Sequence, residues 1–137
     1  MADIRSMVKE LIKIGECSSS NFENGTVRVA FPDRQNMVSS DLPVMVFGGW
    51  GVTNGLPQPG DTVLCLFLGN GLSNGVCIGV IPNDLPGTSN KQGTFFEDGS
   101  YVYYDRSTGQ LMIKPVSKVM IEGDLTVSGT ITASNIT

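Results

Sequence analysis

The sequence predicts a mainly β protein with one N-terminal helix and a C-terminal strand segment that needs further copies of the chain to cover it. The 137 residues include 17 glycines and seven prolines, which is typical of a fold with many turns. Helical periodicity is confined to the first 15 residues. From residue 16 onward, apolar residues alternate with polar ones, as they do along half-buried strands.

Length and composition limit the classes of protein to consider. The chain is long enough for one domain with an appendage, and its 40% hydrophobic content indicates a folded protein. The formal net charge of −4 argues against a nucleic-acid partner. The cysteines at 17, 65 and 77 have no CxxC spacing, and the chain has no histidine. We therefore expect three buried free thiols, no metal site and no cofactor.

The predicted helix occupies residues 1–15. Asp3 is placed to cap its start and Gly15 to end it in a left-handed conformation. The apolar stripe has the spacing of one helix face and consists of Ile4, Met7, Val8, Leu11 and Ile12. It must pack on its own domain or on a neighbouring subunit, and the sequence favours neither. Because "MADIRSMVKE" lacks an apolar signal-peptide core, we expect synthesis and assembly in a reducing cytoplasm.

Residues 16–90 form the predicted barrel. Five short strands are expected near 15–22, 26–31, 42–47, 62–68 and 76–81, separated by turn signals such as "ENG" and "PQPGD". In 26–31 the residues Val27, Val29 and Phe31 share one face, and 62–68 is apolar on both faces. This count and spacing suit a small Greek-key barrel of the OB type. Such barrels often bind oligonucleotides, but residues 42–81 contain no Lys or Arg.

The second domain is expected at 91–137, after a linker over 82–93 that is rich in Pro, Gly, Ser and Asn. "DGSYVYYDRSTGQLMI" predicts two strands joined by a turn at "DRSTG". We interpret Glu97, Asp98 and Asp105 as turn residues rather than as an acidic site. We find no catalytic residues, and we expect a protein that is not an enzyme.

The segment from Leu111 to Ala133 has one apolar and one polar face. Its even positions from 122 to 132 are all polar, whereas the odd positions carry the predicted core, Leu111, Ile113, Val119, Ile121, Leu125, Val127, Ile131 and Ala133. A single ribbon of this kind cannot stand alone, because ordering its backbone costs on the order of 1–2 kcal/mol per residue and its edges stay unpaired. We therefore predict that copies of the chain wrap around one axis, and three copies suffice to enclose the apolar face.

The order of these segments resembles the phage baseplate assembly protein V family, the central spikes of contractile tails, which are related to type VI secretion spikes. The resemblance covers nearly the whole chain, and its most specific parts are "PQPGDTVLCLF" and "GVCIGVIPN". It implies a homotrimer whose OB barrels form a collar and whose tails form an intertwined triple-stranded β-helix. It also implies tail hub and baseplate proteins as partners, assembly in the bacterial cytoplasm, a place in the tail baseplate of a virion or particle, and piercing of a target cell envelope.

Two departures from this family concern the distal end. Some relatives hold an iron ion in a His-x-His motif, which this chain lacks, and some carry a lysozyme domain where this chain has only the linker. Because Ile136 breaks the alternation, we expect the shaft to stop near Ala133. By resemblance, a separate tip cap protein would contact Ile131, Asn135, Ile136 and Thr137, although the tails could equally close over themselves. The alternative interpretation is a trimeric OB-type binding module, adhesin or tail fibre with a fibrous stalk.

Overall fold

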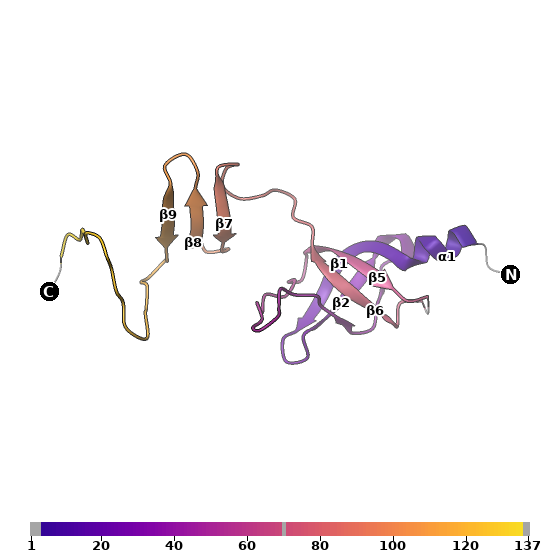
Figure 1. Ribbon diagram of the computed structural model, residues 1–137. Helices are drawn as coiled ribbons and strands as arrows, with labels where there is room; N and C mark the ends of the chain where they lie inside the picture. Colours follow the sequence, from indigo (N-terminus) through magenta and orange to yellow (C-terminus); the bar gives the residue numbers. More distant parts are fainter. Residues whose placement is uncertain (1–3, 70, 136–137) are drawn as a thin grey trace. The chain divides into compact units, whose positions relative to one another are not determined.

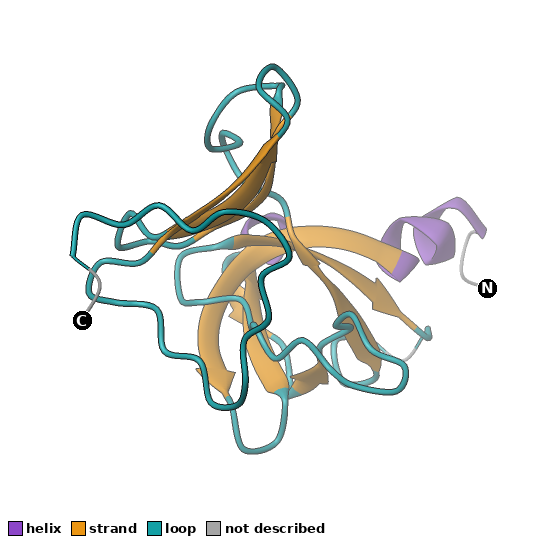
Figure 2. Ribbon diagram, turned by 60° about the vertical axis from the view of Figure 1, so that its left-hand side comes forward, coloured by secondary structure: helices purple, strands orange, loops and turns teal. Residues whose placement is uncertain are grey.

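The computed structural model describes residues 4–69 and 71–135, and it is mainly β, with antiparallel sheets and one short α-helix within those residues (Figure 1). The chain divides into two compact units between Asp84 and Leu85, inside the segment predicted as a linker. No helix in the described part of the chain is long and apolar enough to cross a membrane. Figure 2 shows the strands of each unit and the long loops that join them.

The first unit begins with helix α1 (Ile4–Leu11), which passes directly into strand β1 (Ile12–Asn21). The prediction that the helix ends at Gly15 is wrong. Residues 12–16 instead pair with β5 (Thr62–Phe67), from Ile12 opposite Leu66 to Glu16 opposite Thr62. Gly15 serves close packing rather than capping, because a Cβ there would lie 2.6 Å from the carbonyl oxygen of Ala30.

The sheet of the first unit contains six strands. β2 is Thr26–Phe31, β3 is Met37–Val38, β4 is Leu42–Pro43 and β6 is Gly75–Val80, and a 3₁₀ turn, η1, spans Pro32–Arg34. The strand order is β3-β2-β1-β5-β6, with β4 also paired to β2. The strands predicted at 26–31, 62–68 and 76–81 are confirmed to within one residue at each end.

The strand predicted at 42–47 is shorter in the structure because the segment changes partner. Leu42 and Pro43 pair with β2, whereas Val44 forms a parallel bridge with Cys77 of β6. The Met45 N–H then donates to the Cys77 carbonyl at 2.8 Å. The chain at 42–45 therefore contacts both β2 and β6.

The core of this unit lies between β1, β2, β5 and β6, with Leu42 of β4. Val27, Val29 and Phe31 are fully or almost fully buried, as the alternation in 26–31 predicted. Phe31 packs edge-on against Phe67 with ring centroids 5.6 Å apart. The three cysteines, Cys17, Cys65 and Cys77, are buried in the same cluster as free thiols, as the sequence predicted.

The second unit contains a three-stranded antiparallel sheet of β7 (Lys91–Phe95), β8 (Tyr101–Asp105) and β9 (Gln110–Lys114), in that order. The predicted strand–turn–strand is confirmed as β8 and β9, with Asp105 opposite Gln110 across the turn. β7 begins inside the segment predicted as a linker, because residues 91–95 pair along β8. From Pro115 to Asn135 the chain forms no helix or strand.

Candidate functional site

All eight predicted core residues of the C-terminal segment are exposed in the single chain. Leu111 and Ile113 lie on β9, and Val119, Ile121, Leu125, Val127, Ile131 and Ala133 lie in the irregular segment that follows it. The seven larger side chains keep between 46% and 67% of their surface exposed. The chain does not cover this set of side chains by itself.

The sheet of the second unit extends this apolar surface. The register places Ile113 opposite Val102 and Leu111 opposite Tyr104, so these four side chains share one face of β8 and β9. Val102 and Tyr104 are 40% and 44% exposed. Neither was predicted from the sequence. The length of the turn at 106–109 could have predicted them. A turn of that length pairs Asp105 with Gln110, and this first pair fixes which residues of β8 and β9 lie opposite each other.

The opposite face of the same sheet is covered by its own side chains. Phe95 stacks on Tyr103 at 5.6 Å between ring centroids, and Tyr101 lies 4.8 Å from Tyr103. The Lys91 and Lys114 ammonium groups lie over the Tyr103 and Tyr101 rings at 5.3 and 6.0 Å. Tyr103 is buried as a result. The two faces therefore differ in kind, and the Leu111 face is the one left without a cover.

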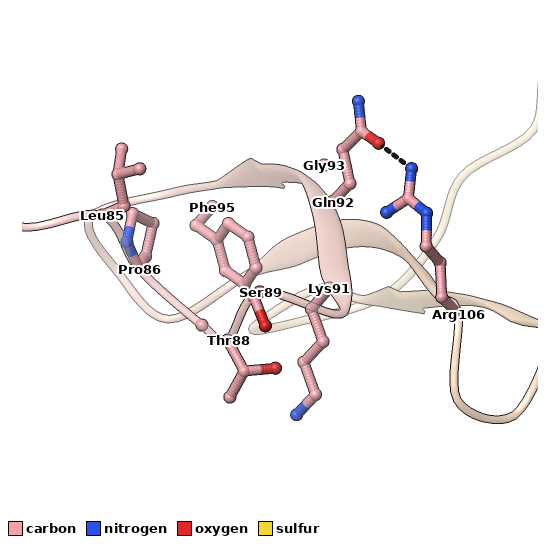
Figure 3. A pocket seen from close by; sticks show the side chains of 10 residues that line it. Leu85, Pro86, Thr88, Ser89, Lys91, Gln92, Gly93, Phe95 and Arg106 are labelled. Carbon is pink, nitrogen blue, oxygen red and sulfur yellow. Dashed lines mark hydrogen bonds between the residues drawn. The ribbon is translucent and has the colours of Figure 1, made fainter.

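A pocket of about 540 Å³ lies between residues 85–89 and β7 (Figure 3). Its lining includes the Phe95 ring, Leu85 and two cationic side chains, Lys91 and Arg106. The Arg106 guanidinium donates to the Gln92 side-chain oxygen. The Lys91 ammonium and the Arg106 guanidinium point in different directions, so the pocket has an aromatic wall and two separate cations (Figure 3). The sequence analysis did not identify it.

The carboxylates near "FEDGSYVYYD" act within their own turns. Asp98 Oδ1 accepts from the Ser100 N–H at 2.9 Å, which lowers the pKa of Asp98. Asp105 Oδ1 accepts from the Ser107 hydroxyl at 2.6 Å and from its N–H at 2.9 Å, which lowers the pKa of Asp105. These two residues are the turn residues that the sequence predicted. Among the described residues, no group of three or more His, Cys, Asp or Glu side chains could hold a metal ion.

A second exposed apolar surface lies in the first unit, on the hairpin Phe47–Thr53. The Thr53 N–H donates to the Phe47 carbonyl at 2.7 Å, and Gly48 bridges Val52, so the loop has its own backbone hydrogen bonds. Phe47 is 86% exposed and Trp50 is completely exposed. Residues 42–60 contain no charged side chain. Exposed aromatic side chains in an uncharged loop are typical of protein contact surfaces.

The predicted contacts of a tip protein are only partly placed. Ile131 and Asn135 are exposed, and Ile136 and Thr137 lie outside the described residues. Comparison of the chain with models of known protein families finds no match, and comparison with curated proteins finds none either.

Proposed function

We propose that the protein is a structural component, the trimeric central spike of a contractile phage tail or phage-derived particle. The observation that carries the proposal is the uncovered apolar surface of residues 111–133, which continues onto Val102 and Tyr104. A buried aliphatic side chain stabilises a fold by about 1.5–3 kcal/mol relative to an exposed one. Covering this surface with two further copies of the chain recovers that stabilisation without any cofactor.

The first unit is the OB-type barrel of this spike. Residues 42–45 support the closure of its sheet, because they pair with β2 on one side and bridge β6 on the other. A sheet whose outer strands share a connecting segment has fewer open edges. Three such barrels form the collar, and the three C-terminal segments intertwine below it as a triple-stranded β-helix.

The work of such a spike is mechanical. Inter-chain strand ladders around an apolar interior make a shaft stiff, and the outward Thr and Ser side chains of 122–132 keep its surface polar. The shaft is driven through the target cell envelope when the tail sheath contracts. No catalytic step and no bound cofactor is needed for this action.

Tail hub and baseplate proteins are the expected partners of the first unit. The exposed hairpin around Trp50 and the exposed helix residues Ile4 and Val8 support this assignment, because these apolar side chains lie outside the proposed shaft. At the distal end, a separate tip cap protein would bind through the last strands of the three chains. Deleting residues 131–137 should then abolish co-purification of that cap and leave the trimer intact.

The molecular mass in solution tests the proposal. One chain has a mass of 14.6 kDa, so a homotrimer has three times that mass, about 44 kDa. We expect sedimentation or light scattering to give the trimer mass at micromolar concentration. A monomer under those conditions would exclude the spike, since its shaft requires three chains.

The pocket beside Phe95 favours a second candidate function, a trimeric binding module or adhesin with a fibrous stalk. A module of this kind should bind host cells saturably as an isolated protein. Replacing Arg106 with Gln should then weaken the binding, because one of the two cations at the pocket is lost. A spike should show no saturable binding of the isolated protein, and Arg106→Gln should leave its assembly unchanged.

A further inference from the structure

Two of the three buried cysteines face each other across neighbouring strands. Cys65 on β5 is the direct partner of Cys77 on β6, and both are fully buried as free thiols. The two strands run side by side and are joined by the turn between Phe67 and Gly75 (Figure 1). Nothing in the proposed spike function requires these thiols.

The hydrogen-bond register shows that the cysteine pair is of the closely spaced type. The Leu68 N–H donates to the Asn74 carbonyl at 2.9 Å, which makes that pair a hydrogen-bonded one. Since the two types alternate along an antiparallel ladder, Phe67–Gly75 is non-hydrogen-bonded, Leu66–Val76 is hydrogen-bonded, and Cys65–Cys77 is again non-hydrogen-bonded. The Cys77 carbonyl accordingly faces away from β5 and accepts from the Met45 N–H.

This pair type brings the two cysteines within disulfide range. Cα atoms of a non-hydrogen-bonded pair lie about 4.5 Å apart, and disulfides span roughly 4.4–6.8 Å between Cα atoms. Cys17 is placed differently. Its sulfur lies against the carbonyl oxygens of Ser19 and Pro57, at 3.5 and 3.9 Å, and it is not a register partner of either cysteine.

The two thiols already interact. The Cys65 side chain lowers the pKa of the Cys77 thiol. The Cys77 side chain, together with burial, raises the pKa of the Cys65 thiol. Cys77 is therefore the better nucleophile of the pair, because the thiolate is the form that attacks a disulfide.

We propose that Cys65 and Cys77 are a modification site that closes to an intrachain cross-strand disulfide when the folded protein meets a small disulfide oxidant such as oxidised glutathione. The bond forms only where such an oxidant is present. It then holds the β5–β6 hairpin closed. This inference is independent of the proposed spike function, because it rests on the register of the first unit alone.

The reaction balances as two thiol–disulfide exchanges. The Cys77 thiolate attacks one sulfur of oxidised glutathione, a mixed disulfide forms, and one glutathione thiolate leaves with the proton that Cys77 lost. The Cys65 thiolate then attacks the Cys77 sulfur of the mixed disulfide and releases the second glutathione. The protein loses two electrons and two protons, and one glutathione disulfide becomes two glutathione thiols.

Burial makes this reaction depend on local opening of the hairpin. Among the described residues, β6 pairs with β5 on one side and is held on the other by the Val44 bridge and the Met45 hydrogen bond, so the oxidant reaches the cysteines when these contacts open. We expect oxidation to be slow at low temperature and faster on mild warming below the melting transition. Once the disulfide has formed, β5 and β6 are covalently joined, and the local separation that let the oxidant reach the cysteines no longer occurs.

The test uses the full-length protein with and without oxidised glutathione. The number of titratable thiols in the denatured chain should fall from three to one, and peptide mapping should join Cys65 to Cys77. The melting temperature of the first unit should rise by on the order of 10 °C, since the bond closes a short loop in the unfolded chain.

Two variants serve as controls. Cys17→Ser should still form the disulfide and lose both remaining thiols, whereas Cys77→Ser should keep two thiols and show no rise in melting temperature. If Cys77→Ser does not fold, the peptide map of the wild-type chain decides. Three free thiols after warming with the oxidant, or a map that joins Cys17 or two separate chains, would overturn the proposal.

Discussion

At the scale of single residues, Gly15 shows how the first unit depends on one missing side chain. It lies in β1 beside β2, and a Cβ there would meet the Ala30 carbonyl oxygen and the Val29 side chain at 2.6 Å each. Backbone atoms cannot move aside as the end of a flexible side chain can. The strand pairing on both sides of β1 therefore requires glycine at this position.

Gly15→Ala should destabilise the first unit by about 1–3 kcal/mol, the usual cost of overpacking a core. Gly55→Ala is the matched control, because a Cβ at Gly55 meets nothing within 4 Å. Chemical denaturation followed by circular dichroism measures both variants. Equal stability of the two would show that β1 can shift to admit the methyl group.

A buried lysine makes the stability of the same unit depend on pH. Lys13 is buried, and its ammonium lies 2.6 Å from Asp33 Oδ2 and 3.7 Å from Glu10 Oε2. The hydrogen bond from Lys13 lowers the pKa of Asp33 from its ordinary value of 3.8. A lowered folded-state pKa gives stabilisation that is complete above the unfolded value and is lost as the pH falls through the folded value.

Asp33→Asn should therefore lower the melting temperature at pH 7, and the difference from the wild type should shrink as the pH falls below 3.8. Asp41→Asn is the control, since its partner Arg28 is exposed and a surface ion pair contributes little. Thermal melts at pH 7 and pH 2.5 measure both. A difference for Asp33→Asn that persists undiminished at low pH would contradict the assignment.

At the scale of elements, the alternation of apolar and polar residues in the C-terminal segment decides which side chains face the inside of the proposed shaft. Val127 and Thr126 are neighbours, and the proposed shaft puts one inside and the other outside. Val127→Asp would bury three like charges near one axis, which costs several kcal/mol per site and should dissociate the trimer. Thr126→Asp should leave the trimer intact. Sedimentation of both variants measures the difference, and equal tolerance would show that the inner face is assigned wrongly.

Local patterns in the sequence were enough to predict the elements that local chemistry determines. Strands 26–31 and 62–68 and the turn at "DRSTG" follow from alternation and turn residues alone. The end of α1 at Leu11 could not be predicted, because "IKIG" suits a helix end equally well and pairing with β5 decides against it. The partner change at Val44, the start of β7 at Lys91 and the pocket beside Phe95 depend on contacts between distant residues, so no local pattern announces them.

At the scale of the whole molecule, the two units on either side of the division after Asp84 differ in how much hydrophobic core each one has. The first unit has a buried core of its own, whereas in the second unit Tyr103, 7% exposed, is the one buried hydrophobic side chain among the described residues. A fragment of residues 1–90 keeps α1 and β1 to β6 and should fold as a monomer with β-type circular dichroism. A random-coil spectrum would show that the first unit needs the rest of the chain.

The ion pairs at the end of α1 also make one part of the molecule sensitive to ionic strength. Glu10 accepts a hydrogen bond from Arg34 of η1 and lies beside Lys13. These ion pairs stabilise the last turn of α1, a helix that is too short to be stable by itself. Salt screens such half-exposed pairs but hardly affects buried apolar contacts. Deuterium should therefore enter the amides of Val8–Leu11 faster as salt is added, while those of Val27 and Val29 stay equally protected. The exchange rate of the sheet amides would then be independent of salt, whereas the exchange rate of the helix amides would depend on the ionic strength of the solvent.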